Sequence, residues 1–172
     1  MSTESLFAIV VLLGLLGIAV VGDLRNHRIP NVLILLGLGL GLASQAYSAG
    51  LAGLGHGVLG MLIGFTVFLP MYALGGMAAG DVKLMAMVGA FLTPYDALSS
   101  ALFSLIAGGV CGILIVLIRG QLQRTLERYW LMLTVRAYLA PVADEVAGKP
   151  FPYSVAILSG TLVSLFGLPF GL

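Results

Sequence analysis

Charged side chains are scarce in this sequence, and cysteine and histidine are scarcer still. Asp, Glu, Lys and Arg together make up 9% of the 172 residues, the formal net charge is +1, and the chain has one cysteine and two histidines. A net charge so close to zero gives no electrostatic footprint for nucleic acid. The lone Cys111 excludes an intramolecular disulfide and a CxxC metal site, and its position in an apolar run indicates a packing residue.

Apolar residues and glycine fill the rest of the chain. Hydrophobic residues account for 60% of the sequence, and there are 24 glycines. This composition is typical of a polytopic membrane protein. A crossing helix needs about 20 apolar residues, and the clear candidate runs are Leu6–Gly22, Val32–Tyr47, Leu54–Tyr72, Leu98–Ile118 and Tyr153–Phe170.

A further apolar run, Val82–Leu92, is too short to cross a bilayer by itself. If it does cross, the glycine-rich segment before it must add to its membrane depth, which would put Asp81 below the surface. With this run included, we predict an all-α fold. It would be a polytopic membrane bundle of six transmembrane helices, forming a single domain over residues 1–172 without a separate soluble domain.

The basic residues predict the orientation of these helices. With six spans, all eight Lys and Arg residues fall in the first, third and fifth loops: Arg25, Arg28, Lys83, Arg119, Arg124, Arg128, Arg136 and Lys149. Loops rich in Lys and Arg stay in the cytoplasm. We therefore expect these loops on the cytoplasmic side and both termini outside the cytoplasm. Without the short span, the later basic residues would fall on the wrong side.

The fifth loop is the one long connection. Between Gln121 and Leu133, apolar residues recur at helical spacing and arginines lie on the opposite face. That pattern is typical of a helix on an anionic membrane surface, although it would also suit a helix that binds a partner. We predict a cytoplasmic interfacial helix between the fifth and sixth spans, ended by Pro141.

Two aspartates, Asp23 and Asp81, lie at the edges of apolar runs and open on the same side in this topology. Carboxylates near hydrocarbon are costly, so they tend to be retained for function. Two neighbouring carboxylates share one proton and can act as general base and general acid around a water molecule. Such a pair titrates as a unit, so neither residue receives a fixed role. The structural alternatives are an N-cap role for Asp81 and an ion pair of Asp23 with a neighbouring arginine.

Other residues beside the aspartates are candidates for binding or positioning a substrate. The nearby glycines would let a substrate strand approach the backbone. Pro30 presets φ where a helix restarts, and Asn31 after it could cap that helix. The Lys83 side chain either reaches the lipid headgroups or changes the electrostatic environment of Asp81. These candidates are Gly76, Gly80, Pro30, Asn31 and Lys83. His27 and His56 fall on opposite sides, so we predict no metal site and no cofactor.

Three stretches of the chain resemble the type IV prepilin peptidases, the membrane aspartic proteases of the GxGD class. Specifically, the chain resembles the short form found with tight-adherence (Flp) pilus systems. The stretches are Asp23 with Arg28-Ile29-Pro30-Asn31, then Gly80-Asp81-Val82-Lys83-Leu84, then Pro152-Tyr153-Ser154-Val155-Ala156-Ile157. In one departure, Ala78 stands where the motif has its first glycine, which bears on how a substrate strand is tolerated there.

The resemblance implies a hydrolase of the bacterial inner membrane. Asp23 and Asp81 would be its catalytic pair and would cut the short basic leader from prepilin or pseudopilin substrates at the cytoplasmic face. Long members of the family also carry a cysteine-rich region and methylate the new N-terminus. With a single cysteine, this chain is expected to be a peptidase without methyltransferase activity. The lipid bilayer is its other expected partner, and the sequence carries no indication of oligomeric state.

A non-enzymatic alternative is a small transporter or pilus assembly factor in which the aspartates relay protons or cations. The depth of the aspartates argues against it, because transporter sites lie near the bilayer midplane.

Glycines four residues apart recur within the spans and predict close helix packing. These pairs are Gly37 and Gly41, Gly53 and Gly57, Gly60 and Gly64, and Gly108 and Gly112.

Overall fold

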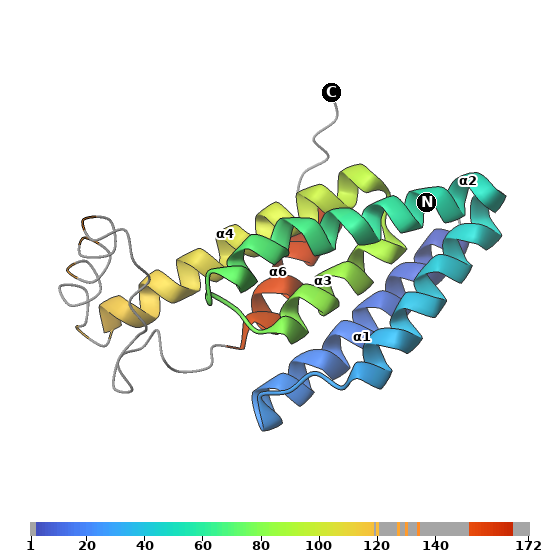
Figure 1. Cartoon of the computed structure of the whole chain (residues 1–172). Coiled ribbons are helices and arrows are strands. Elements are labelled where there is room, and N and C mark those ends of the chain that lie inside the picture. Colours follow the sequence, from blue (N-terminus) through green and yellow to red (C-terminus); the bar gives the residue numbers. More distant parts are fainter. Residues whose placement is uncertain are drawn as a thin grey trace.

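A computed structural model describes residues 3–118, 120, 127, 130, 134 and 152–166. Within these residues the structure gives bounds for five helices and contains no strand, which confirms the all-α prediction for this part of the chain (Figure 1). The helices are α1 (Thr3–Asn26), α2 (Asn31–Ala73), α3 (Ala79–Phe91), α4 (Pro94–Ile118) and α6 (Tyr153–Phe166). The predicted interfacial helix and its end at Pro141 lie almost wholly outside the described residues.

Helix α2 consists of two arms joined at a sharp break. Helical geometry is interrupted at Ala49 (φ −139°, ψ 20°) and Gly50 (φ 61°, ψ −140°). Glycine adopts the positive φ at no steric cost. Beyond the break the chain turns back, since the backbone at Gly53 lies against the carbonyl of Gln45 (Figure 1). The break falls between the two runs that the sequence predicted as separate helices, so α2 comprises an arm of residues 31–48 and an arm of residues 51–73.

The shortest helix, α3, lies at the centre of the bundle. From Asp81 to Phe91 every residue except Lys83 is buried, and α3 contacts α1, α2, α4 and α6. A helix that is apolar on all sides belongs in the interior of a protein. At 13 residues α3 is about 20 Å long, so it need not span the roughly 30 Å of hydrocarbon on its own.

Glycines bring α3 into backbone contact with both arms of α2. A side chain at Gly60 or Gly64 would collide with the backbone of α3, and one at Gly89 would collide with the backbone of Gly60. On the other arm, Gly37 lies against the Met87 side chain and Gly41 against Phe91. Burial of apolar surface between helices gains little free energy in lipid, because lipid is itself apolar. Close approach of the helix backbones stabilises a membrane bundle instead, through van der Waals contact. The packing predicted for these glycines is confirmed.

The glycine pair on α4 behaves differently from the others. Gly108 lies against the Tyr153 side chain of α6, as a packing glycine should. Around Gly112, no atom of the described residues lies within 4 Å of the position a Cβ would take. The prediction of close packing is therefore wrong for Gly112 within this part of the chain. Residues four apart, such as Gly108 and Gly112, point in directions that differ by about 40° around the helix axis. This difference lets Gly108 make a contact that Gly112 does not make.

Polar side chains support two of the helix ends opposite the aspartates. The amide of Gln45 donates to the carbonyl of Phe91 at 3.0 Å and satisfies the C-terminal end of α3. Helix α4 begins at Pro94, earlier than the predicted Leu98, because Thr93 and Asp96 form a cap. The Thr93 hydroxyl is 2.7 Å from a carboxylate oxygen of Asp96 and accepts from the Asp96 N–H at 3.3 Å.

Three described helical segments are long and apolar enough to cross a membrane. They are Leu6–Asn26, Asn31–Ala73 and Pro94–Ile115, and the apolar helix α6 is shorter. Large apolar side chains also cover the outside of the bundle, with Phe7 71% exposed and Leu35 68% exposed. An apolar exterior over a packed interior is the arrangement expected of a protein whose solvent is lipid.

Candidate active site

Asp23 lies in the last turn of α1 with its side chain buried. The residue is 8% exposed in spite of its position at a helix end. The helix stops three residues later, where the His27 N–H donates to the Asp23 carbonyl at 2.8 Å and His27 takes a positive φ of 49°. Histidine is among the non-glycine residues that adopt this conformation more often. The turn reverses the chain into α2 and leaves the Asp23 side chain facing inward.

Asp81 is the third residue of α3 and is 5% exposed. Its Oδ2 accepts from the backbone N–H of Ala78 at 3.0 Å, while the Asp81 N–H donates to the Ala78 carbonyl at 3.1 Å. Ala78 is the N-cap residue, so the alternative that Asp81 is itself the N-cap is wrong. The segment before it is a turn and a helix start, and Gly80 and Asp81 are helical rather than extended.

The two aspartates come together at one end of the bundle. Asp23 is near enough to Asp81 for the carboxylates to interact electrostatically, and Asp81 interacts in the same way with Tyr153. The beginning of α6 closes this group, because the buried Ser154 hydroxyl donates to Asp23 Oδ2 at 2.6 Å. Three helices that are far apart in the sequence therefore supply the polar groups of one buried cluster.

Four other residues predicted from the sequence lie at the start of α2 and the start of α3. Lys83 is exposed, and its Nζ donates to Asn31 Oδ1 at 3.2 Å, which ties α3 to the start of α2. Pro30, at φ −62° and ψ 128°, is the N-cap position of α2, and no side chain caps that end. Asn31 therefore binds Lys83 and does not cap the helix. A Cβ at Gly80 would lie 3.7 Å from the Ile29 side chain, in ordinary contact.

Gly76 has a structural role at the end of α2. The N–H of Gly76 donates to the Met71 carbonyl at 2.8 Å, and that of Gly75 donates to the Tyr72 carbonyl at 2.9 Å. Gly75 takes a φ of 74°. This is the Schellman arrangement that commonly ends a helix. A substrate-binding role for Gly76 remains a prediction beside this capping role.

The sequence does not predict the contribution of α6 to this cluster. Tyr153 and Ser154 stand in the third motif, and no role follows for them from the sequence alone. In the structure Tyr153 packs edge-on against Phe68, with ring centroids 5.8 Å apart, and its hydroxyl donates to the Ser104 carbonyl of α4 at 3.5 Å. Tyr153 and Ser154 are two polar residues at the start of an apolar helix. Buried polar groups need hydrogen-bond partners, so this pattern could have indicated that they bind other polar groups of the site.

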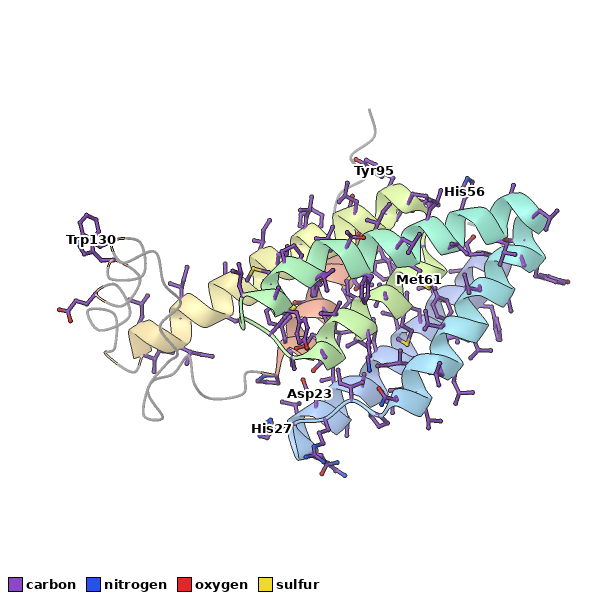
Figure 2. The ribbon with its side chains drawn as sticks, in the orientation of Figure 1. Asp23, His27, His56, Met61, Tyr95 and Trp130 are labelled. Atoms are coloured by element: carbon purple, nitrogen blue, oxygen red, sulfur yellow. The ribbon has the colours of Figure 1, made fainter. Side chains whose placement is uncertain are left out.

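The histidines lie at opposite ends of the bundle, as predicted. Figure 2 shows His27 beside Asp23 at one end and His56 at the far end, nearer Tyr95. Among the described residues, no three side chains of the metal-binding types His, Cys, Asp and Glu are grouped together. The polar cluster of this part of the chain is therefore built from carboxylates and hydroxyls.

Comparison with known proteins agrees with this arrangement. The profile of the type IV leader peptidase family matches residues 10–113, a range that includes both aspartates. A prepilin leader peptidase/N-methyltransferase of Myxococcus xanthus (strain DK1622) is 32% identical over 126 residues, which cover 69% of this chain and 37% of that protein. The chain thus spans well under half of that relative's length. No solved structure matches the chain. With more than half of its residues matched, the chain belongs to the type IV leader peptidase family.

Proposed function

We propose that this protein is a membrane-embedded aspartic endopeptidase that removes the leader from type IV prepilin-like substrates, with Asp23 and Asp81 as its catalytic pair. The observation that carries the proposal is the burial of two interacting carboxylates at one end of an apolar bundle. Ionised carboxylates that are removed from water are costly unless they do something that an apolar residue cannot. In a chain of the type IV leader peptidase family, peptide hydrolysis is that purpose.

The arrangement suits acid-base hydrolysis of a peptide bond. Asp23 and Asp81 each have one oxygen held by a hydrogen bond, from Ser154 and from the Ala78 N–H respectively. The second oxygen of each is then available to a water molecule and to the scissile amide. One carboxylate would remove a proton from the water while the other, protonated, donates to the substrate. Proton transfer between the two would restore the starting state.

The position of the pair along the helices favours a peptidase over a proton or cation transporter. Asp23 is in the last turn of α1 and Asp81 is in the first turn of α3. Transport sites lie near the middle of the bilayer, whereas a prepilin would present its cleavage point at the boundary between its charged leader and its apolar helix. We therefore infer that the cluster works at the membrane surface.

The same reasoning supports six crossing helices, made by α1, the two arms of α2, α3, α4 and α6. Their ends alternate between the two sides of the bundle, with Asp23 and His27 at one end and Tyr95 at the other (Figure 2). Arg25, Arg28 and Lys83 accompany the aspartates. Positive residues stay in the cytoplasm, so we infer that the cluster opens there, in the inner membrane of a bacterial cell.

Cysteine labelling tests this orientation. In a Cys111→Ser background, Asn26→Cys should resist an impermeant thiol reagent in intact cells, while Tyr95→Cys should react with it. Both positions are exposed on the bundle, so a difference in labelling reports the side of the membrane. After the cells are opened, both variants should react, which controls for thiol accessibility. Labelling of Asn26→Cys from outside would contradict cytoplasmic cleavage.

Direct processing tests the activity. The purified chain in proteoliposomes should convert a prepilin to a shorter product whose mass corresponds to loss of the leader. A carboxylate pair activates water without a metal, so a chelator should leave the rate within about twofold of its untreated value. Mass spectrometry of the product measures the cleavage site. Loss of activity in chelator, restored by zinc, would argue against the aspartic mechanism.

The chemistry proposed for these 172 residues is hydrolysis without methyl transfer. The sequence contains one cysteine, Cys111, and lacks the cysteine-rich region that the resemblance associates with methylation. The Myxococcus relative, whose name includes N-methyltransferase, is much longer than the matched part. The product of the processing assay should therefore carry an unmethylated N-terminus when S-adenosylmethionine is supplied.

A further inference from the structure

A hydrogen bond joins the start of α6 to the first aspartate. The Ser154 hydroxyl donates to Asp23 Oδ2 at 2.6 Å, across 131 positions of sequence, and Ser154 is fully buried. A hydroxyl that donates to a carboxylate makes a shorter and stronger hydrogen bond than it does to a neutral acceptor. The burial of both groups keeps water from competing for either one.

Ser154 uses its hydroxyl differently from the other buried serines and threonines of the described residues. Ser104 donates to the Ser100 carbonyl at 2.7 Å, and Thr161 donates to the Ile157 carbonyl at 2.7 Å, each within its own helix. The Ser100 hydroxyl pairs with that of Thr161 at 2.9 Å. Those contacts satisfy hydroxyls and join helices. The contact of Ser154 instead restrains an ionisable side chain.

Restraint matters at this position because Asp23 sits at a helix end next to a chain reversal. An aspartate can rotate about χ1 and χ2, and each rotation would move its oxygens relative to Asp81. Asp81 is anchored by a backbone N–H of its own helix start. For Asp23, the anchor described in the structure comes from another helix, α6. The geometry of the pair therefore depends on where α6 begins.

We propose that Ser154 is a positioning residue for proteolysis, which holds Asp23 with one oxygen fixed and the other directed to Asp81 and the reacting water. This inference rests on the proposed function. It predicts that loss of the hydroxyl lowers the rate of the chemical step and leaves substrate binding unchanged. Ser154 touches neither water nor substrate in this role, since it acts through Asp23.

The test measures kcat and KM for prepilin cleavage by Ser154→Ala, Ser154→Cys and Ser154→Thr in proteoliposomes. Loss of one charge-assisted hydrogen bond corresponds to a fall in kcat of roughly tenfold to a hundredfold for Ser154→Ala, with KM within about twofold of the wild type. Ser154→Thr keeps the hydroxyl and should restore kcat to within about threefold of the wild type. Ser154→Cys keeps the volume but donates weakly, and should fall between them.

Ser100→Ala is the matched control. It removes an equally buried hydroxyl and the Ser100–Thr161 contact between α4 and α6, but that hydroxyl does not bond Asp23 or Asp81. We expect a lower melting temperature and an unchanged kcat. If Ser154→Ala lowered only the melting temperature, as this control does, Ser154 would be a packing residue and the proposal would be overturned. Equal losses of kcat in the Ala and Thr variants would overturn it as well.

A double-mutant cycle separates this inference from the proposed function. Ser154→Ala and Asp23→Ala, singly and together, should shift the melting temperature non-additively, because each removes one partner of the same hydrogen bond. This readout needs no activity. If the wild-type chain cleaves no prepilin while the coupling is present, the proposed function fails and the hydrogen bond is structural only. Additive shifts would show that the two side chains do not interact.

Discussion

Asp23→Asn and Asp81→Asn are each expected to lower the rate of prepilin cleavage by about 100- to 10,000-fold. Either change leaves a side chain of nearly the same shape but removes a group that can accept or release a proton. Asp23 and Asp81 interact and are only 8% and 5% exposed. Bulk water therefore has little access with which to replace a lost carboxylate as proton donor or acceptor. Initial rates of product formation, measured on purified protein in proteoliposomes, give the factor for each variant.

The double variant and a distant aspartate serve as controls. Residues that act as one unit are not additive, so the double Asn variant should be no slower than the slower single one. Asp96→Asn alters the cap of α4, at the opposite end of the bundle from the aspartate pair. It should cost about 1 kcal/mol of stability at most and leave cleavage intact. Normal cleavage by either single variant would remove that residue from the catalytic pair.

Gly89→Val is expected to destabilise the bundle by about 3 kcal/mol or more, the second large effect. A Cβ at Gly89 would collide with the carbonyl oxygen of Gly60, and one at Gly60 would collide with that of Gly89. A backbone carbonyl cannot move away as a side chain can. Because α3 carries Asp81, its displacement should also remove cleavage. Thermal unfolding in detergent and size-exclusion chromatography measure the loss.

Two other glycines calibrate this result. Gly55 is on the same arm as Gly60, and no described atom lies within 4 Å of the position its Cβ would take, so Gly55→Ala should be neutral or slightly stabilising through helix propensity. Gly37→Ala meets the flexible thioether of Met87, which can move, and should cost less than Gly89→Val. A Gly89→Val protein as stable as the Gly55→Ala protein would contradict the backbone contact between α2 and α3.

The glycine pattern shows how far sequence reasoning extends into the packing. Spacing of four residues correctly indicated close packing at Gly37, Gly41, Gly60 and Gly64, because such residues share a helix face. It did not indicate which neighbour they meet. Gly112 satisfies the same spacing without meeting any described atom. Spacing specifies a face of a helix, and the arrangement of the other helices decides whether that face is covered.

The candidate site shows a similar division between local and distant information. Burial of a carboxylate at the edge of an apolar run is costly wherever the run lies, so the residues alone were enough to single out Asp23 and Asp81. The capping turn at Gly75 and Gly76 also has a local cause, since it depends on the positive φ of one glycine. From the sequence, Gly76 is predicted to make room for a substrate strand, because it is one of the glycines near Asp81 and glycine removes side-chain obstruction.

Composition and local pattern were enough to establish the class of the protein, the apolar runs that became its helices, and the two aspartates. Each of these follows from residue content or from hydrogen bonds made within one segment. The central place of the short helix α3 and the contact of Ser154 with Asp23 emerged from the folded arrangement instead. An apolar run has the same composition whether lipid or protein surrounds it. A hydrogen bond between residues so far apart exists only after the intervening helices have packed.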